Sequence, residues 1–180
     1  MKRKTPDLAL LDDVVSDKVL GAMRVASARL RELGVRHVLV GALAVGAHGY
    51  PRATRDVDFL VGDEAFEHHE GGVVTLKPGV PIQVGGVIVD HLSATPEEPY
   101  LADALPPADA SPEVPIASAA VVVYLKLRSS RLRDKADVVE LLKSGLEAPP
   151  CRAYLTAHAP DLLRAFDELV EEAAREDAAP

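Results

Sequence analysis

Two aspartates, Asp56 and Asp58, are separated by one residue in the stretch Arg-Asp-Val-Asp-Phe-Leu-Val that ends at residue 61. Side chains two residues apart on a β-strand point to the same side, so this spacing predicts two carboxylates held together. Neighbouring negative charges repel each other unless a cation neutralises them or one acid takes up a proton. Hard divalent ions such as Mg²⁺ bind oxygen ligands of this kind. The pair is therefore a candidate metal site.

A third acid, Asp90, interrupts the apolar run Val-Ile-Val-Asp-His-Leu at residues 87–92. If that run is a strand beside residues 57–61, its carboxylate joins the first two. Three acids on neighbouring strands can hold two metal ions, which stabilise the charge that develops when a nucleoside triphosphate (NTP) is split at its α-phosphate. Asp56, Asp58 and Asp90 are the predicted metal ligands and catalytic residues, with Mg²⁺ as cofactor and an NTP as substrate.

Other residues near the acids could hold the nucleotide. Gly41 follows an apolar run and leaves room for phosphate against the backbone, and the start of a short helix there would attract anions. Arg52 and Arg55 would add positive charge. The predicted nucleotide-binding residues of this region are Gly41, Ala42, Arg52 and Arg55.

The elements that must position these residues follow from the spacing of apolar residues. Residues 11–33 have the period of a helix, which Gly34 would end. Residues 56–61 alternate as a strand does. Gly85-Gly86 can supply the positive φ angles of a two-residue hairpin, so the sheet is expected to be partly antiparallel. The other expected elements are strands at 37–40, 73–76, 80–84 and 87–92, short helices at 42–47 and 63–70, and a loop at 48–51.

The second half of the chain changes character. Residues 96–115 contain six prolines and several acids, which predicts a loop and the best candidate for a domain boundary. The residues after it have helical spacing, including a last amphipathic helix at 162–174. The predicted fold class is α/β, a mixed β-sheet flanked by helices with a helical C-terminal region. The expected division is a core with an N-terminal helix at 1–110 and a helical region packed on it at 111–180.

Composition and charge limit the partners. The 180 residues, 48% hydrophobic and 27% charged, are typical of a globular protein. The single Cys151 excludes an intramolecular disulfide and favours a reducing compartment, so a cytoplasmic location is expected. No apolar run reaches the roughly 20 residues that cross a membrane, so no membrane partner is expected. The net charge of −8 repels nucleic acid except at a local basic patch, for which residues 126–135 are the candidate.

These motifs together resemble the nucleotidyltransferase superfamily, in which a strand ending in glycine and a small residue leads through a short helix to Asp-x-Asp. His48-Gly49, residues 52–58, the Asp90 strand and residues 125–138 are similar to the bacterial branch that contains abortive-infection toxins. The resemblance covers roughly residues 36–143 and implies a nucleotidyltransferase-like fold.

The resemblance also implies roles for individual residues. The family's acids that match Asp56, Asp58 and Asp90 bind metal. A lysine that matches Lys126 contacts the triphosphate, and an aspartate near Asp134 or Asp137 supports the site. The chain departs from the family at Gly41-Ala42, where Gly-Ser or Gly-Gly is usual, so a phosphate-binding hydroxyl is missing.

Each motif also has a purely structural interpretation. Asp-x-Asp is common as a solvated strand end, a charged run such as 126–135 is usually a solvated helix face, and His48 fits a loop or packing role. Lys126 could be a surface lysine whose stem covers apolar neighbours. Haloacid dehalogenase phosphatases and glycosyltransferases also use Asp-x-Asp, but there the apolar strand precedes the pair, whereas here it follows. A zinc site from His68, His69 and His91 would lack a recognised ligand spacing.

The expected function is metal-dependent transfer of a nucleoside monophosphate (NMP) from an NTP to a hydroxyl or phosphate acceptor on a protein, an RNA or a small molecule. One alternative is a noncatalytic relative that only binds a nucleotide or a partner, which Ala42 favours. Another is one component of a toxin–antitoxin pair, whose acidic surface binds a basic antitoxin.

Overall fold

A mixed β-sheet forms the centre of the molecule. The computed structural model describes residues 5–94, 96–109 and 113–178. The sheet has four strands in the order β1-β2-β6-β5. Strand β2 is antiparallel to β1 and parallel to β6, and β5 is antiparallel to β6, which confirms the predicted mixed α/β sheet. The strands are β1 (His37–Leu39), β2 (Asp56–Val61), β5 (Gln83–Val84) and β6 (Val87–Ser93).

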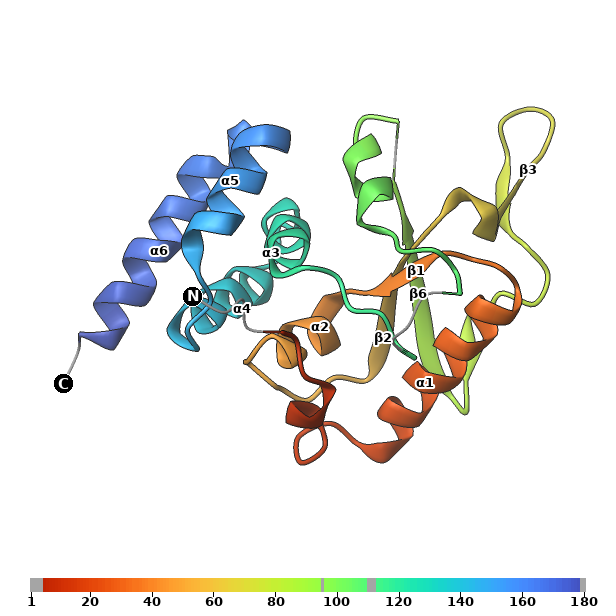
Figure 1. The fold of residues 1–180 in the computed structure, drawn as a ribbon, viewed down its shortest axis with the longest axis horizontal. Helices are drawn as coiled ribbons and strands as arrows, with labels where there is room; N and C mark the ends of the chain where they lie inside the picture. Colours follow the sequence, from red (N-terminus) through yellow and green to blue (C-terminus); the bar gives the residue numbers. More distant parts are fainter. Residues whose placement is uncertain (1–4, 95, 110–112, 179–180) are drawn as a thin grey trace.

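One face of this sheet is covered by helix α1 (Asp17–Glu32), as Figure 1 shows. His37 of β1 is buried and lies 2.8 Å from the hydroxyl of Ser27 on α1, and its ring meets Phe59 of β2 edge-on. Alternate residues of β2 and β6, including Val57 and Val89, are buried in the same core cluster. The residues between them point to the other face, which is where the acids lie.

The N-terminal helix begins later than the sequence predicts. Residues 11–33 form the end of a 3-10 helix, η1 (Leu8–Leu11), then a turn, and then α1. Ser16 at the start of α1 has extended backbone angles, and Asp12 and Asp13 precede it. Short polar side chains of this kind favour turns and helix starts over helix interiors. Leu11 and Val15 are both buried, so the apolar spacing continues across a break in the helix.

A hairpin replaces the helix that was predicted at residues 63–70. The 3-10 helix η2 (Asp63–Ala65) is followed by β3 (Phe66–His68), which pairs antiparallel with β4 (Val74–Leu76). Gly71 and Gly72 at the tip both have positive φ angles, which glycine adopts without steric cost. The strand predicted at 80–84 is limited to β5, and Gly85 and Gly86 form the expected turn with φ angles of 55° and 85°.

The C-terminal region consists of helices. Before them, η3 (Pro99–Ala104) lies within the predicted loop, and Ile116 bridges to Leu39 alongside β1. The predicted boundary between residues 110 and 111 lies outside the described residues. Figure 1 shows α5 and α6 on the far side of α3 and α4 from the sheet. The helices are α2 (Gly41–Ala47), α3 (Ala119–Arg128), α4 (Leu132–Lys143), α5 (Ala148–His158), η4 (Pro160–Leu162) and α6 (Leu163–Asp177).

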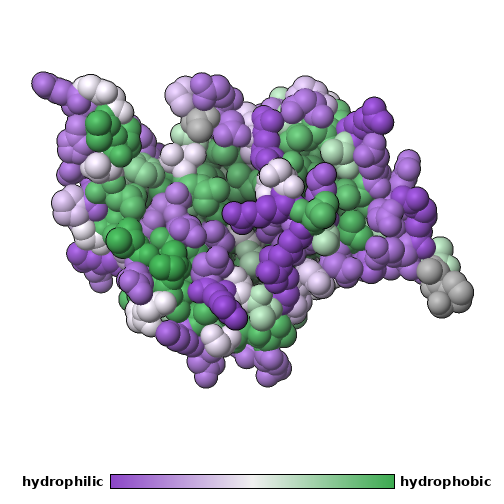
Figure 2. All heavy atoms as spheres, turned by 180° about the vertical axis from the view of Figure 1, so that it is seen from behind, coloured by the Kyte–Doolittle hydropathy of each residue, from purple (hydrophilic) through white to green (hydrophobic). Residues whose placement is uncertain are grey.

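The surface is mixed in character. Apolar residues show in patches among hydrophilic ones on the face seen in Figure 2. Leu132 is the most exposed large hydrophobic residue described, with 81% of its surface accessible. Across the described parts of the chain, no helix combines the length and the apolar character that a bilayer crossing requires.

Candidate functional site

The three predicted acids lie on one face of the sheet. Asp58 of β2 is paired in register with Asp90 of the parallel strand β6. Asp56 precedes Asp58 by two positions and so points to the same side. The intervening Val57 and the neighbouring Val89 are buried on the opposite face. The placement of the three acids follows the sequence prediction, and all of them line one cavity.

The cavity lies between the open face of the sheet and the C-terminal helices. Its volume is about 400 Å³, which is within the usual size range of small-molecule sites. The sheet contributes the acids, and Gly41 and Ala42 line it from the start of α2. The C-terminal region contributes charged residues of both signs, namely Lys126, Arg131, Arg133 and Asp134.

The surroundings of Asp58 raise the pKa of its carboxyl. Burial is the main cause that raises its pKa to about 6. The negative charges of Asp56 and Asp90 add to the rise, and the positive charges of Lys126 and Arg131 oppose it. A carboxylate in this position is destabilised by its neighbours, so a cation bound among the acids would relieve the repulsion.

The chemistry of this donor set fits a hard divalent cation. Among the residues that the structure describes, no three or more His, Cys, Asp or Glu side chains converge closely enough to hold a metal ion by themselves. Mg²⁺ does not need such a cage, because one or two carboxylates commonly hold it while water and substrate phosphates complete the octahedron. One or two of the carboxylates of Asp56, Asp58 and Asp90 therefore fit part of such a shell, which other oxygen ligands would complete.

Position 41 needs glycine, because Asp58 lies too close to leave room for a side chain. Its φ angle is +65°, and a Cβ atom at this position would lie 2.0 Å from Oδ2 of Asp58. The space beside Gly41 is thus filled by the carboxyl of Asp58. Ala42 lines the cavity beside it and is buried.

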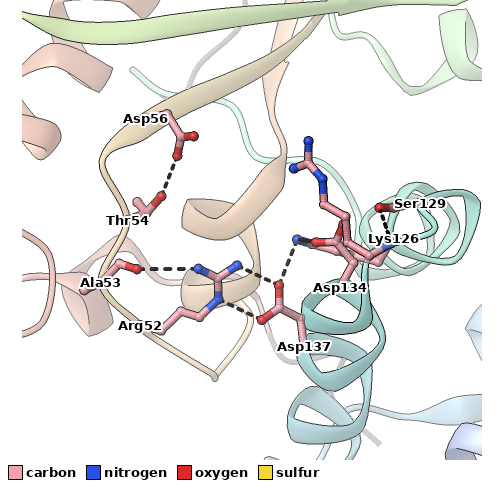
Figure 3. A network of polar contacts seen from close by, with 9 residues as sticks. Arg52, Ala53, Thr54, Asp56, Lys126, Ser129, Asp134 and Asp137 are labelled. Carbon is pink, nitrogen blue, oxygen red and sulfur yellow. Dashed lines mark hydrogen bonds and ion pairs between the residues drawn. The ribbon is translucent and has the colours of Figure 1, made fainter.

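A buried ion-pair network joins the acidic segment to the C-terminal helices (Figure 3). Arg52 donates to both carboxylate oxygens of Asp137 at 2.7 and 2.8 Å. The ammonium of Lys126 lies 2.8 Å from Asp137 and 2.5 Å from Asp134. The side chain of Asp137 is only 2% exposed and that of Lys126 only 9%. Lys126 and Arg52 therefore reach the cavity as members of this network.

The network controls the ionisation of its acids. Burial by itself would raise the pKa of Asp137, but hydrogen bonds from Arg52 and Lys126 outweigh it and hold that pKa below its usual value. Burial would also raise the pKa of Asp134, but hydrogen bonds from Lys126 and Ser129 together with the positive charge of Lys126 lower it below its usual value. Both carboxylates are therefore ionised at neutral pH.

Thr54 is a site residue that the sequence interpretation gave no role. Its hydroxyl donates to Oδ1 of Asp56 at 2.6 Å, as Figure 3 shows, and so restricts how that carboxyl can turn. Thr54 stands two residues before Asp56, so the same period of two that identified the acids also indicates it. Arg55, which was predicted to face the nucleotide, is exposed and is not among the residues that line the cavity.

The basic run at residues 126–135 is divided by the fold. Arg131 and Arg133 line the same cavity as the acids. Arg128 lies over the ring of Tyr124, and with Lys135 it lines a separate cavity of about 350 Å³ against α6. The run therefore does not form one continuous basic surface.

The histidines lie outside the cavity. His48 bonds to the carbonyl of Ala117, and burial lowers its pKa, which agrees with a packing role. His68 contacts Asp63, and His69 contacts Thr75. The described residues contain no metal-binding group of the kind that a zinc site from these histidines would need.

Comparisons with known proteins show only distant structural similarity. No protein-family model matches the chain. Among curated proteins, no sequence matches it. Among solved structures, the chain is similar to an antigenic nucleotidyltransferase-like protein from Paracoccidioides brasiliensis, with a TM-score of 0.46 and 15% identity, over 86% of this chain and 94% of that one. A similarity this weak assigns no role to any residue of this chain, and the site is interpreted from its own residues.

Gly41→Ala should destabilise the protein more than Gly34→Ala. Both glycines have similar positive φ angles, +65° and +68°, but an added Cβ meets nothing within 4 Å at Gly34 and meets Asp58 at Gly41. The backbone strain alone should cost about 1–2 kcal/mol in either variant. Urea denaturation should show a clearly larger loss for Gly41→Ala, and Asp58→Ala in the same chain should recover part of it. Equal losses at the two glycines would contradict the close contact.

Asp137→Ala should lower the free energy of unfolding by about 3–5 kcal/mol, because it leaves two largely buried cations without their shared partner. The matched control is Glu140→Ala on the same helix. Glu140 pairs with Lys143 near the surface, where such a pair contributes about 1 kcal/mol or less. Denaturation of the three proteins in parallel measures the difference. A loss at Asp137 no larger than that at Glu140 would contradict the network's role.

Because of the same network, the stability of the protein should depend on pH in the acidic range. The pKa of Asp137 is lower in the folded protein than the value of about 4 expected when unfolded, so the unfolded state binds its proton more tightly. Its contribution is complete above about pH 5 and is lost as the pH falls through the folded pKa. Thermal unfolding between pH 7 and pH 3 should show a smaller loss for Asp137→Asn than for the wild type. Parallel curves would show that another group controls acid stability.

Proposed function

We propose that the chain is a metal-dependent nucleotidyltransferase, which transfers an NMP from an NTP to a hydroxyl or phosphate acceptor and releases pyrophosphate. The observation that carries the proposal is the in-register pairing of Asp58 with Asp90 on the face that also bears Asp56. Such a concentration of carboxylates at a cavity is unfavourable without a cation. The motif resemblance to the abortive-infection branch supports the same chemistry.

Each residue of the cavity would have a separate role. Asp56, Asp58 and Asp90 would hold Mg²⁺, which neutralises the charge that develops on the phosphates during transfer. Thr54 would keep the carboxyl of Asp56 in one orientation, because it already donates to one of its oxygens. Asp58 lies beside Gly41, so the acid and the start of α2 form one rigid wall of the cavity.

The proposal predicts that Asp58→Asn abolishes nucleotide transfer. The protein is incubated with Mg²⁺, each α-labelled NTP in turn, and protein, RNA or small-molecule acceptors, and labelled products are measured. Loss of a metal ligand should slow transfer by more than about a hundredfold, because the metal contributes several kcal/mol of transition-state stabilisation. Asp90→Asn should have a similar effect.

The matched control for this experiment is Asp63→Asn. Asp63 also lies next to β2, but its side chain is 80% exposed and its contact is with His68 outside the cavity. This variant should transfer label at the wild-type rate. Transfer that survives in Asp58→Asn and Asp90→Asn, or that is absent from the wild type, overturns the proposal.

A second candidate function is nucleotide binding without transfer, which the methyl group of Ala42 favours. Ala42 lines the cavity where a hydroxyl would otherwise contact phosphate. Calorimetry with MgATP and the labelling experiment together separate the two functions. Tight binding without turnover supports the binding module, and in that case Ala42→Ser should strengthen binding by adding a phosphate-binding hydroxyl. Absence of binding rejects both functions.

A further inference from the structure

The cations that line the cavity fall into two groups. Lys126 is buried and is held between Asp134 and Asp137 by short contacts, and Arg52 is paired with Asp137. Arg131 and Arg133 are exposed at the cavity, and in the described part of the chain neither guanidinium forms an ion pair. The two groups therefore differ in how much of their charge is available to a ligand.

Lys126 is poorly suited to bind a ligand directly. Its charge is already matched by the two carboxylates, and moving its ammonium away from them to a ligand in the cavity would break both contacts. Asp137 would then keep only Arg52 as a partner while remaining buried. Leaving a buried carboxylate with fewer partners is strongly unfavourable. The arrangement instead makes Lys126 a residue that holds α3 and α4 in place.

Arg131 and Arg133 are well suited to bind an anion. They come from the start of α4 and line the same cavity as the acids of the sheet. Figure 3 shows Asp56 on the strand side of this site and Asp134 on the helix side. A guanidinium offers several N–H donors in a plane and binds phosphate oxygens in pairs. An acidic wall and a basic wall on one cavity match a ligand that carries a metal cation at one end and negative oxygens at the other.

We infer that Arg131 and Arg133, and not Lys126, bind the polyphosphate chain of a metal-complexed substrate. The inference rests on the proposed function, because it assigns the substrate's phosphates to that same cavity. The acids of the sheet face the metal-bound end of the chain, and the two arginines face its outer oxygens. Lys126 contributes indirectly, because its ion pairs hold α3 against α4 and so position the two arginines.

The test is calorimetry with inorganic tripolyphosphate and Mg²⁺, which requires no turnover. The variants are Arg131→Gln, Arg133→Gln and the double variant, with Lys135→Gln as the matched control. Lys135 is on the same helix but lines the other cavity, so its loss removes the same charge from a different place. Each arginine variant should bind about tenfold more weakly, which is the value of one charge-assisted hydrogen bond, and the double variant more weakly still. The melting temperatures of the arginine variants should stay close to the wild-type value, because these side chains are exposed and form no ion pair among the described residues.

Two outcomes overturn the inference. One is unchanged tripolyphosphate affinity in the double variant. The other is a loss in Lys135→Gln as large as in the arginine variants, which would indicate a general charge effect. Lys126→Gln should lower the melting temperature, and tripolyphosphate affinity measured well below that temperature should change less than in the double variant.

The result is separable from that of the proposed function. If label transfer depends on Asp58 while the double variant binds tripolyphosphate normally, the inference fails and the proposed function stands. If the arginines are needed for binding but no transfer occurs, the inference stands and the enzyme proposal fails.

Discussion

The parallel pairing of β2 with β6 is the constraint on which the rest of the structure depends. One register sets Asp58 opposite Asp90 and thereby places three carboxylates on one face. A shift by a single residue would turn Asp90 toward the side that buries Val87 and Val89. Parallel strands need a long connection, usually a helix, but here the connection contains η2, the β3–β4 hairpin and β5. The segment that joins β2 to β6, and so sets the acidic face, therefore contains short strands in place of a long helix.

Concentrated negative charge must be offset, and the offset comes from the other half of the chain. Arg131 and Lys126 both act against the rise in the pKa of Asp58. Lys126 in turn is fixed by Asp137, which also binds Arg52 from the segment before β2. The sheet supplies the carboxylates and the C-terminal helices supply the cations. The site is thus completed only when the helices pack on the sheet, and Asp137 is the residue that joins them.

The parts of the structure that sequence could predict are those set by local spacing. The period of two identified Asp56 and Asp58, and the polar interruption of an apolar run identified Asp90. The fold class and the Gly85-Gly86 turn also followed from local patterns. The sequence predicts a helix where β3 lies, because the segment is mostly polar and only partly buried, and its pairing with β4 is what makes it a strand. The periodicity of a three-residue segment does not show whether it pairs with a neighbouring strand.

The cations of the cavity also show what the sequence alone could not predict. Lys126, Arg131 and Arg133 lie within eight positions, and their charges alone do not show which of them is free to bind an anion. The fold separates them, because only Lys126 reaches the buried carboxylate of Asp137. With a net charge of −8, the protein as a whole repels anions, so any attraction must be local. An anion without a metal would also be repelled by the acids of the sheet. In the proposed complex the two walls therefore select a ligand with both charges and fix its direction, with the metal toward β2 and β6 and the outer phosphates toward α4.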